Sequence, residues 1–139
     1  MQKTEKNEFL SMDIHPEVKN KVLKICNFSQ FRYKEDIVKK HIEITVLSIL
    51  SDRPMSGYDI IKEIFARYDF LVSQGTIYSL LYTLKDEGTL VVGFAKGDMR
   101  EKIYSCTKEG KHDVDKRIAE FIEANESFLN SIKECVHDV

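Results

Sequence analysis

The apolar positions of this sequence recur at helical spacing from residue 15 to residue 87, a pattern typical of helices that bury one face. Pro16 suits the first position of a helix, and Pro54 ends a later one because proline disfavours helix at the residue before it. Ser56 is a suitable N-cap, and Gly88 is a suitable stop. The predicted helices cover residues 15–27, 35–50, 56–67 and 73–87. The third of them is expected to bury the apolar positions Tyr58, Ile61, Ile64 and Phe65.

After Gly88 the pattern changes to that of a β-hairpin. Residues 89–95 are rich in strand formers, Lys96-Gly97-Asp98 is a turn signal, and residues 99–106 form the return strand. Thr107 can then cap a final helix that runs to Val136, and a length of roughly 45 Å is more than a domain of this size can cover. The element order predicts a mainly α fold with a small β-hairpin: a winged helix-turn-helix plus a long C-terminal dimerisation helix.

The composition is that of one ordinary globular domain. The chain has 139 residues, of which 42% are hydrophobic and 32% charged. Its three cysteines lack C-x-x-C spacing, so neither a disulfide framework nor a zinc knuckle is expected. The absence of a long apolar run and of a signal-peptide core predicts a cytoplasmic protein with no membrane partner. We expect an N-terminal extension with a helix (1–34), a winged-helix domain (35–106) and a dimerisation helix (107–139).

The net charge of −2 does not by itself indicate a nucleic-acid binder. The charges are unevenly distributed, however. Residues 1–41 carry nine Lys and Arg against six Asp and Glu, whereas residues 106–139 carry five against eight. The basic front of the chain therefore permits contact with phosphate, although such a charge run is often only solvated.

The outer face of the predicted 73–87 helix carries hydroxyl and amide groups and one cation. Glutamine can pair with adenine through two hydrogen bonds, and serine and threonine can bond to several bases. Tyrosine hydroxyls and the N–H groups of a helix N-terminus can bind phosphate. Because a merely solvated face usually carries Glu and Lys, we interpret this one as a DNA-contact face. Its candidate residues are Ser73, Gln74, Thr76, Tyr78, Ser79, Tyr82, Thr83 and Lys85.

The predicted hairpin contributes three further cations. Arg100 and Lys102 are two residues apart and are expected to share one strand face, with Lys96 across the turn. A basic wing can lie against phosphate, and the alternative is a solvated hairpin. We therefore add Lys96, Arg100 and Lys102 to the candidate DNA-contact residues.

The C-terminal helix carries apolar residues at alternating spacings of four and three, which is the pattern of a coiled-coil seam. A stripe this wide has to bury against more than one partner helix. We expect the same helix of a second copy of the chain, together with the predicted 15–27 helix of either copy. Asn125 lies in the seam, where a buried asparagine can fix the register. The candidate interface residues are Val114, Ile118, Phe121, Ile122, Asn125, Phe128, Leu129, Ile132 and Cys135.

Catalytic and cofactor motifs are absent from the sequence: it contains no phosphate-binding glycine loop, no dinucleotide fingerprint, no H-E-x-x-H and no nucleophile elbow. We therefore expect neither an enzyme nor a bound cofactor. His112, Asp113, Cys135 and His137 are possible metal ligands, but Cys135 and His137 are two apart and face away from each other on a helix. A metal site is accordingly not expected.

Four stretches of the chain resemble the PadR family of transcription regulators, in the order and spacing found there. They are residues 53–60, 73–78, 84–88 and 100–110. Gln74 and Ser79 stand where the family often has proline. The resemblance implies a winged-helix fold with a recognition helix starting near Ser73. Some proteins of this family bind planar drugs between aromatic residues, and this chain lacks a tryptophan that could anchor such an effector.

Together, the residues and the resemblance predict a sequence-specific DNA-binding transcriptional regulator, a repressor that acts as a homodimer on a double-stranded operator. Two alternatives stay open. One is a winged helix that serves as a protein–protein interaction module, and the other is a regulator that senses a metal or a small-molecule effector.

Overall fold

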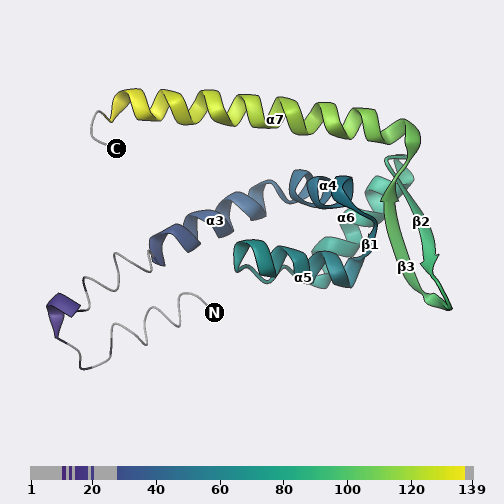
Figure 1. Ribbon diagram of the computed structural model, residues 1–139, viewed down its shortest axis with the longest axis horizontal. Helices are drawn as coiled ribbons and strands as arrows, with labels where there is room; N and C mark the ends of the chain where they lie inside the picture. The colour runs from purple at the N-terminus through teal and green to yellow at the C-terminus, as the bar shows by residue number, and fades with distance from the viewer. Residues whose placement is uncertain (1–10, 12, 14, 19, 21–27, 137–139) are drawn as a thin grey trace.

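The computed structural model describes residues 11, 13, 15–18, 20 and 28–136. Most of the helix predicted over residues 15–27 lies outside them. The described elements follow the predicted order of helices, hairpin and long helix (Figure 1). They are α3 (Phe28–Lys40), α4 (Ile42–Asp52), β1 (Met55–Ser56), α5 (Gly57–Tyr68), α6 (Gln74–Asp86), β2 (Leu90–Ala95), β3 (Asp98–Cys106) and α7 (Lys108–Cys135).

The single helix predicted over residues 35–50 is wrong in two respects. It begins earlier, at Phe28, and residues 28–34 contain no glycine or proline that would oppose a helix there. It is also divided at His41, whose φ of −118° and ψ of 39° lie outside the helical range. The backbone hydrogen bonds continue on both sides of the break, since His41 N donates to the Ile37 carbonyl and Thr45 N donates to that of His41. The result is a bend between α3 and α4.

Three predicted helix starts are confirmed by their capping hydrogen bonds. The Ser56 hydroxyl accepts from Asp59 N at 3.1 Å, and the Thr107 hydroxyl accepts from Gly110 N at 2.8 Å. At the start of α6 the hydroxyl of Ser73 accepts from Thr76 N at 3.2 Å. Each cap satisfies an N–H group that would otherwise lack an acceptor at the first turn.

The predicted hairpin is confirmed, and it is part of a three-stranded antiparallel sheet in the order β1-β3-β2. The added strand, β1, has two residues and was not predicted because so short a segment has no periodicity. Tyr104 of β3 lies between Met55 of β1 and Val92 of β2. The register then moves from Phe94 opposite Lys102 to Ala95 opposite Asp98, so residues 99–101 form a bulge near the turn.

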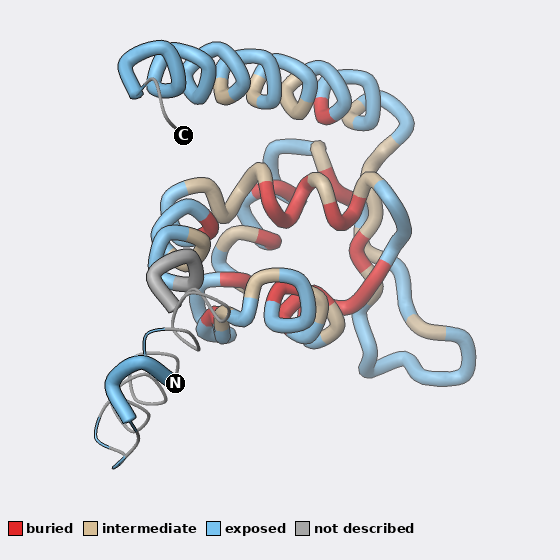
Figure 2. Tube along the Cα trace, turned by 60° about the vertical axis from the view of Figure 1, so that its left-hand side comes forward, coloured by how far each residue is buried: buried red, intermediate tan, exposed pale blue. Residues whose placement is uncertain are grey.

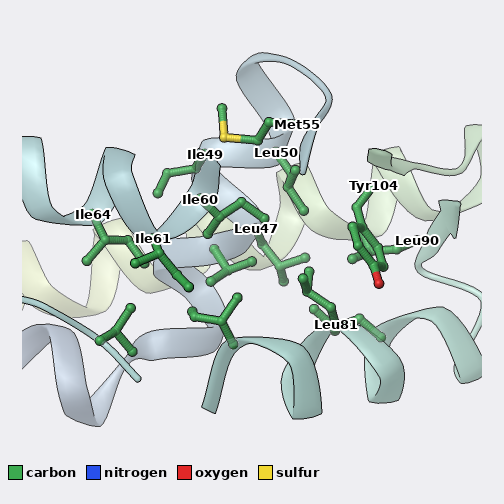
Figure 3. Packing of buried hydrophobic residues seen from close by; sticks show 14 of the residues in the cluster. Leu47, Ile49, Leu50, Met55, Ile60, Ile61, Ile64, Leu81, Leu90 and Tyr104 are labelled. Atoms are coloured by element: carbon green, nitrogen blue, oxygen red, sulfur yellow. The ribbon is translucent and has the colours of Figure 1, made fainter. Parts of the chain in front are cut away.

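The core lies between α4, α5, α6 and the sheet, and α4 is at its centre (Figures 2 and 3). Leu47 of α4, Ile60 of α5 and Leu81 of α6 are fully buried, and Tyr104 closes the sheet side of the cluster. The predicted apolar face of α5 is partly wrong. Ile61 and Ile64 are buried as expected, but Tyr58 and Phe65 are exposed and Ile60 takes their place.

The first third of α7 packs on the same domain. Val114 is completely buried, and Arg117 forms an ion pair with Glu43 of α4. At the same end, Lys111 Nζ donates to the Ser51 hydroxyl at 2.8 Å. The remaining turns of α7 extend past the domain and are mostly exposed (Figure 2). Within the described residues, no helix is both long and apolar enough to cross a membrane.

Candidate nucleic-acid interface

One face of α6 anchors the helix in the core and leaves the opposite face open. Ile77, Leu81 and Leu84 are buried at helical spacing. The predicted contact residues Gln74, Thr76, Ser79, Tyr82, Thr83 and Lys85 are all exposed, and so is the capping residue Ser73. Tyr78 is the exception, because it is only partly exposed. Seven of the eight side chains predicted on this helix therefore face solvent.

Three of the hydroxyls on this face already have partners within α6 or its cap. The Ser73 and Thr76 hydroxyl oxygens are 2.8 Å apart and form one hydrogen bond. The Thr83 hydroxyl donates to the Ser79 carbonyl at 3.1 Å. Ser73 and Thr76 thus hold the first turn of α6 in place. A phosphate oxygen that bonds to either hydroxyl would meet a group that the cap has already positioned.

Tyr78 is held in the corner between α5 and α6. A Cβ atom added to Gly57 would lie 2.7 Å from Cε1 of the Tyr78 ring, so glycine is the residue that leaves room for this ring. Because the contact fixes the ring against the first turn of α5, Tyr78 also positions the two helices relative to each other.

The wing lies next to α6 and brings predicted cations to it. Lys102 Nζ is 5.9 Å from the centroid of the Tyr82 ring. Arg100 and Lys102 both line a hollow of about 420 Å³ between β3 and the starts of α5 and α6, together with Tyr58 and Tyr78. The structure therefore brings Arg100 and Lys102 together with the helix residues. Lys96 is exposed at the hairpin turn and does not line this hollow.

Tyr58 also lines this hollow, although the helical pattern predicts that it is buried in the core. Its side chain is 59% exposed, and Lys62 Nζ lies 4.9 Å from the centroid of its ring. A buried stripe through Ile60 and Ile64 leaves Tyr58 roughly 120–160° away around the helix. The signal that could have found it is its place in the first turn, two residues after the Ser56 cap.

The charges around the hollow are mixed. Asp98 and Glu101 line it beside the two cations. The Asp98 carboxylate accepts a hydrogen bond from Arg100 N at 2.8 Å, which ties it to the wing turn. Lys62 pairs with Asp59 at 3.2 Å. Attraction for a polyanion at this surface would thus come from a few cations and would be moderate.

The second predicted surface, on α7, is divided between two environments. Val114 is buried by its own domain, and Ile118 packs against the same core. The Phe121 ring contacts that of His41 edge-on, with centroids 4.9 Å apart. The exposed apolar side chains begin after it: they are Ile122, Phe128, Leu129, Ile132 and Val136, each between 45% and 62% exposed.

Two polar candidates on α7 are also placed. Asn125 is partly buried, and its Nδ2 donates to the Phe121 carbonyl at 2.8 Å, within the same helix. Cys135 is exposed as a free thiol. Of the possible metal ligands His137 lies outside the described residues. Among the residues that the structure describes, no three His, Cys, Asp or Glu side chains are grouped to hold a metal ion.

Comparison with known proteins gives one family. The model of the transcriptional regulator PadR-like family matches residues 46–116. A PadR-like transcriptional regulator from Bacillus cereus has 21% sequence identity and a TM-score of 0.61, covering 70% of this chain and 97% of that one. A PadR-like transcription factor from Bacteroides fragilis has 26% identity and a TM-score of 0.56, with coverage of 73% and 98%.

A transcriptional regulator from Clostridium thermocellum is similar at 23% identity and a TM-score of 0.59, covering 69% of this chain and 93% of that one. No protein of curated function matches the sequence. The fold predicted from the sequence is confirmed by the solved structures, and the resemblance is confirmed by the family match. Because that match spans just over half of the sequence, the chain belongs to the PadR-like family, a family of transcriptional regulators and not of enzymes.

Proposed function

We propose that this chain is a repressor that binds double-stranded DNA as a homodimer, with α6 in the major groove and the wing against the flanking backbone. One observation carries the proposal: the open face of α6 is exposed, polar and free of carboxylates from Gln74 to Lys85, and it lies beside the cations of the wing. A helix that presents amide and hydroxyl groups without acid is suited to base edges and phosphates.

The proposed DNA contacts are of two kinds, base contacts from α6 and phosphate contacts from the neighbouring hollow. Gln74, Ser79 and Tyr82 are exposed along α6, where they can reach base edges. Arg100, Lys102 and Tyr58 surround the neighbouring hollow, where a backbone phosphate can be bound by two cations and a phenol. Within this proposal residues 35–106 bind DNA, residues 107–139 dimerise and residues 1–34 form an N-terminal extension.

The dimer is supported by the exposed stripe on α7. Exposed apolar side chains that recur on one helix face are costly in water and are typical of an interface. The stripe continues into a hollow between α3 and α7, lined by Ile37, Tyr68, Ile118 and Ile122. The buried Val114 has no surface to offer, so the proposed interface begins at Ile118 and is completed by α3.

A dimer explains how a chain with few cations on this surface can still bind DNA tightly. Two copies place two α6 helices on one side of the duplex, about 34–36 Å apart for half-sites separated by one helical turn. Linking the two contacts raises the combined affinity well above that of either. A cytoplasmic protein bound across a promoter in this way would exclude the transcription machinery, which is the simplest route to repression.

The proposal is tested by titrating labelled duplex DNA with the full chain at several salt concentrations. A mixed-sequence duplex and genomic fragments retained by the protein are the two probes. Binding should weaken as salt rises. Lys102→Ala removes one phosphate contact from each of the two copies, so the slope of log K against log salt should become shallower by about 1.8, which is about 0.9 per contact. Lys116→Ala, which removes an exposed lysine on α7, is the matched control and should leave the slope unchanged.

A chain that shows no salt-dependent binding to either duplex would contradict DNA binding. Equal effects of the two lysine variants would contradict the placement of the wing. If the protein retains genomic DNA but does not lower reporter expression from the bound promoter, the repressor role is contradicted and DNA binding still stands.

A further inference from the structure

Phe94 is an exposed aromatic side chain on the wing that packing within the chain does not explain. Leu90, Val92 and Phe94 alternate along the core-facing side of β2. Leu90 is 2% exposed and Val92 still packs against the core, but Phe94 is 51% exposed. The hairpin continues past the body of the domain (Figure 1), so the sheet face extends beyond the core that it covers.

The neighbours of Phe94 are those of the proposed DNA surface. Lys102 lies directly opposite Phe94 in the antiparallel pair, and opposite residues project from the same face. Lys102 in turn reaches the Tyr82 ring of α6. Phe94 is therefore on the wing face that turns toward α6, beside a cation.

We propose that the Phe94 ring packs on a deoxyribose of the DNA backbone next to the phosphate that Lys102 binds. The inference rests on the proposed function and adds a contact of a different kind. A DNA backbone alternates charged phosphates with sugars that present C–H groups, so a cation with a flanking aromatic ring matches one phosphate and the adjoining sugar. Removing the ring and the sugar from water stabilises the complex without neutralising any charge.

This chemistry has a signature that separates it from a cationic contact. Counterion release sets the salt dependence of binding, and an apolar contact releases no counterions. Phe94→Ala should therefore lower the affinity for a mixed-sequence duplex about fivefold at every salt concentration. The slope of log K against log salt should stay that of the unsubstituted protein, whereas Lys102→Ala changes the slope.

The matched control is Val91→Ala on the same strand. Val91 is 48% exposed and pairs with Ser105, so it projects from the opposite face of the hairpin. This variant should bind like the unsubstituted protein. Phe94→Leu, which keeps an apolar side chain of similar reach, should recover most of the affinity. Because both altered side chains are half exposed, thermal unfolding should be little changed, and it is measured alongside.

Three results would overturn the proposal while the unsubstituted protein still binds DNA. The first is unchanged DNA affinity of Phe94→Ala, which would mean that the exposed ring contacts a protein partner instead of DNA. The second is a changed salt slope, and the third is an equal loss in Val91→Ala. Absence of binding by the unsubstituted protein would instead overturn the proposed function from which this contact follows.

Discussion

At the scale of single residues, Tyr104 combines full burial with an unused hydroxyl. Its side chain is 1% exposed, and the hydroxyl has no hydrogen-bond partner among the described residues. Burial raises the pKa of the phenol, and the neighbouring Tyr82 and Tyr78 raise it further. Both effects disfavour the phenolate, so the group stays neutral. Leaving such a hydroxyl without a partner costs about 1–3 kcal/mol of stability.

We therefore expect Tyr104→Phe to leave the free energy of unfolding unchanged or to raise it by about 1 kcal/mol, because it removes the unsatisfied hydroxyl and keeps the ring. Tyr104→Ala should lower it by about 3–5 kcal/mol, because it opens a cavity between the sheet and α6. Urea denaturation followed by circular dichroism measures both. A loss of more than 1 kcal/mol in Tyr104→Phe would show that the hydroxyl is hydrogen-bonded in solution.

Sequence patterns predicted the residues whose roles are local and missed those whose roles depend on packing. Ser56, Ser73 and Thr107 were identified as helix starts because a cap acts within three residues. The exposed face of α6 could be read from its polar composition. Tyr58 and Val114 were misplaced, because which side of an apolar stripe meets the core is decided by elements distant in sequence.

At the scale of elements, the junction between α6 and α7 depends on Thr107. Its hydroxyl accepts from Gly110 N in the first turn of α7 and donates to the Gly88 carbonyl at 2.9 Å. Gly88 has a φ of 81°, a left-handed conformation that favours glycine, and it ends the preceding helix. One side chain thus connects the end of one helix to the beginning of the next, on either side of the hairpin.

Thr107→Ala should lower the free energy of unfolding by about 1–2 kcal/mol, because two hydrogen bonds of the junction are lost. Thr107→Ser keeps the hydroxyl and should retain most of the stability. Chemical denaturation compares the two with the unsubstituted chain. If the serine variant loses as much as the alanine variant, the threonine methyl rather than the hydroxyl accounts for the effect.

The order of elements was predictable, whereas their interruptions were not. The bend at His41 arises where the His41 ring packs against Phe121 of α7, a contact between residues far apart in the chain. The strand β1 exists because β3 offers it a free edge. Neither feature leaves a periodic signal in the sequence, because each is defined by its partner.

At the scale of the whole molecule, α7 lies in two different environments along its length. Its first turns are fastened to α4 by Val114 and by the Arg117–Glu43 ion pair. Its later turns carry the exposed stripe. Phe121 lies at the boundary, where it touches His41 of its own chain, so replacing it would disturb the domain and the proposed dimer together. Phe128 and Leu129 lie beyond the boundary and are 62% and 50% exposed.

Replacing Phe128 and Leu129 together with alanine should therefore weaken the dimer without unfolding the domain. The control replaces Ser127 and Asn130 with alanine; both are exposed on the other side of α7 by helical periodicity. Sedimentation velocity at micromolar concentration should find the first variant largely monomeric and the control dimeric. Circular dichroism should find the same helix content in both.

The same pair of variants connects assembly to DNA binding. If two copies are needed to engage two half-sites, the monomeric variant should lose affinity for a retained genomic fragment by a factor of at least about 100. Its weak binding to a short duplex that holds one half-site should stay the same, because the surface of α6 and the wing is unaltered. Equal losses on both duplexes would mean that α7 supports the DNA surface directly and that the stripe has another partner.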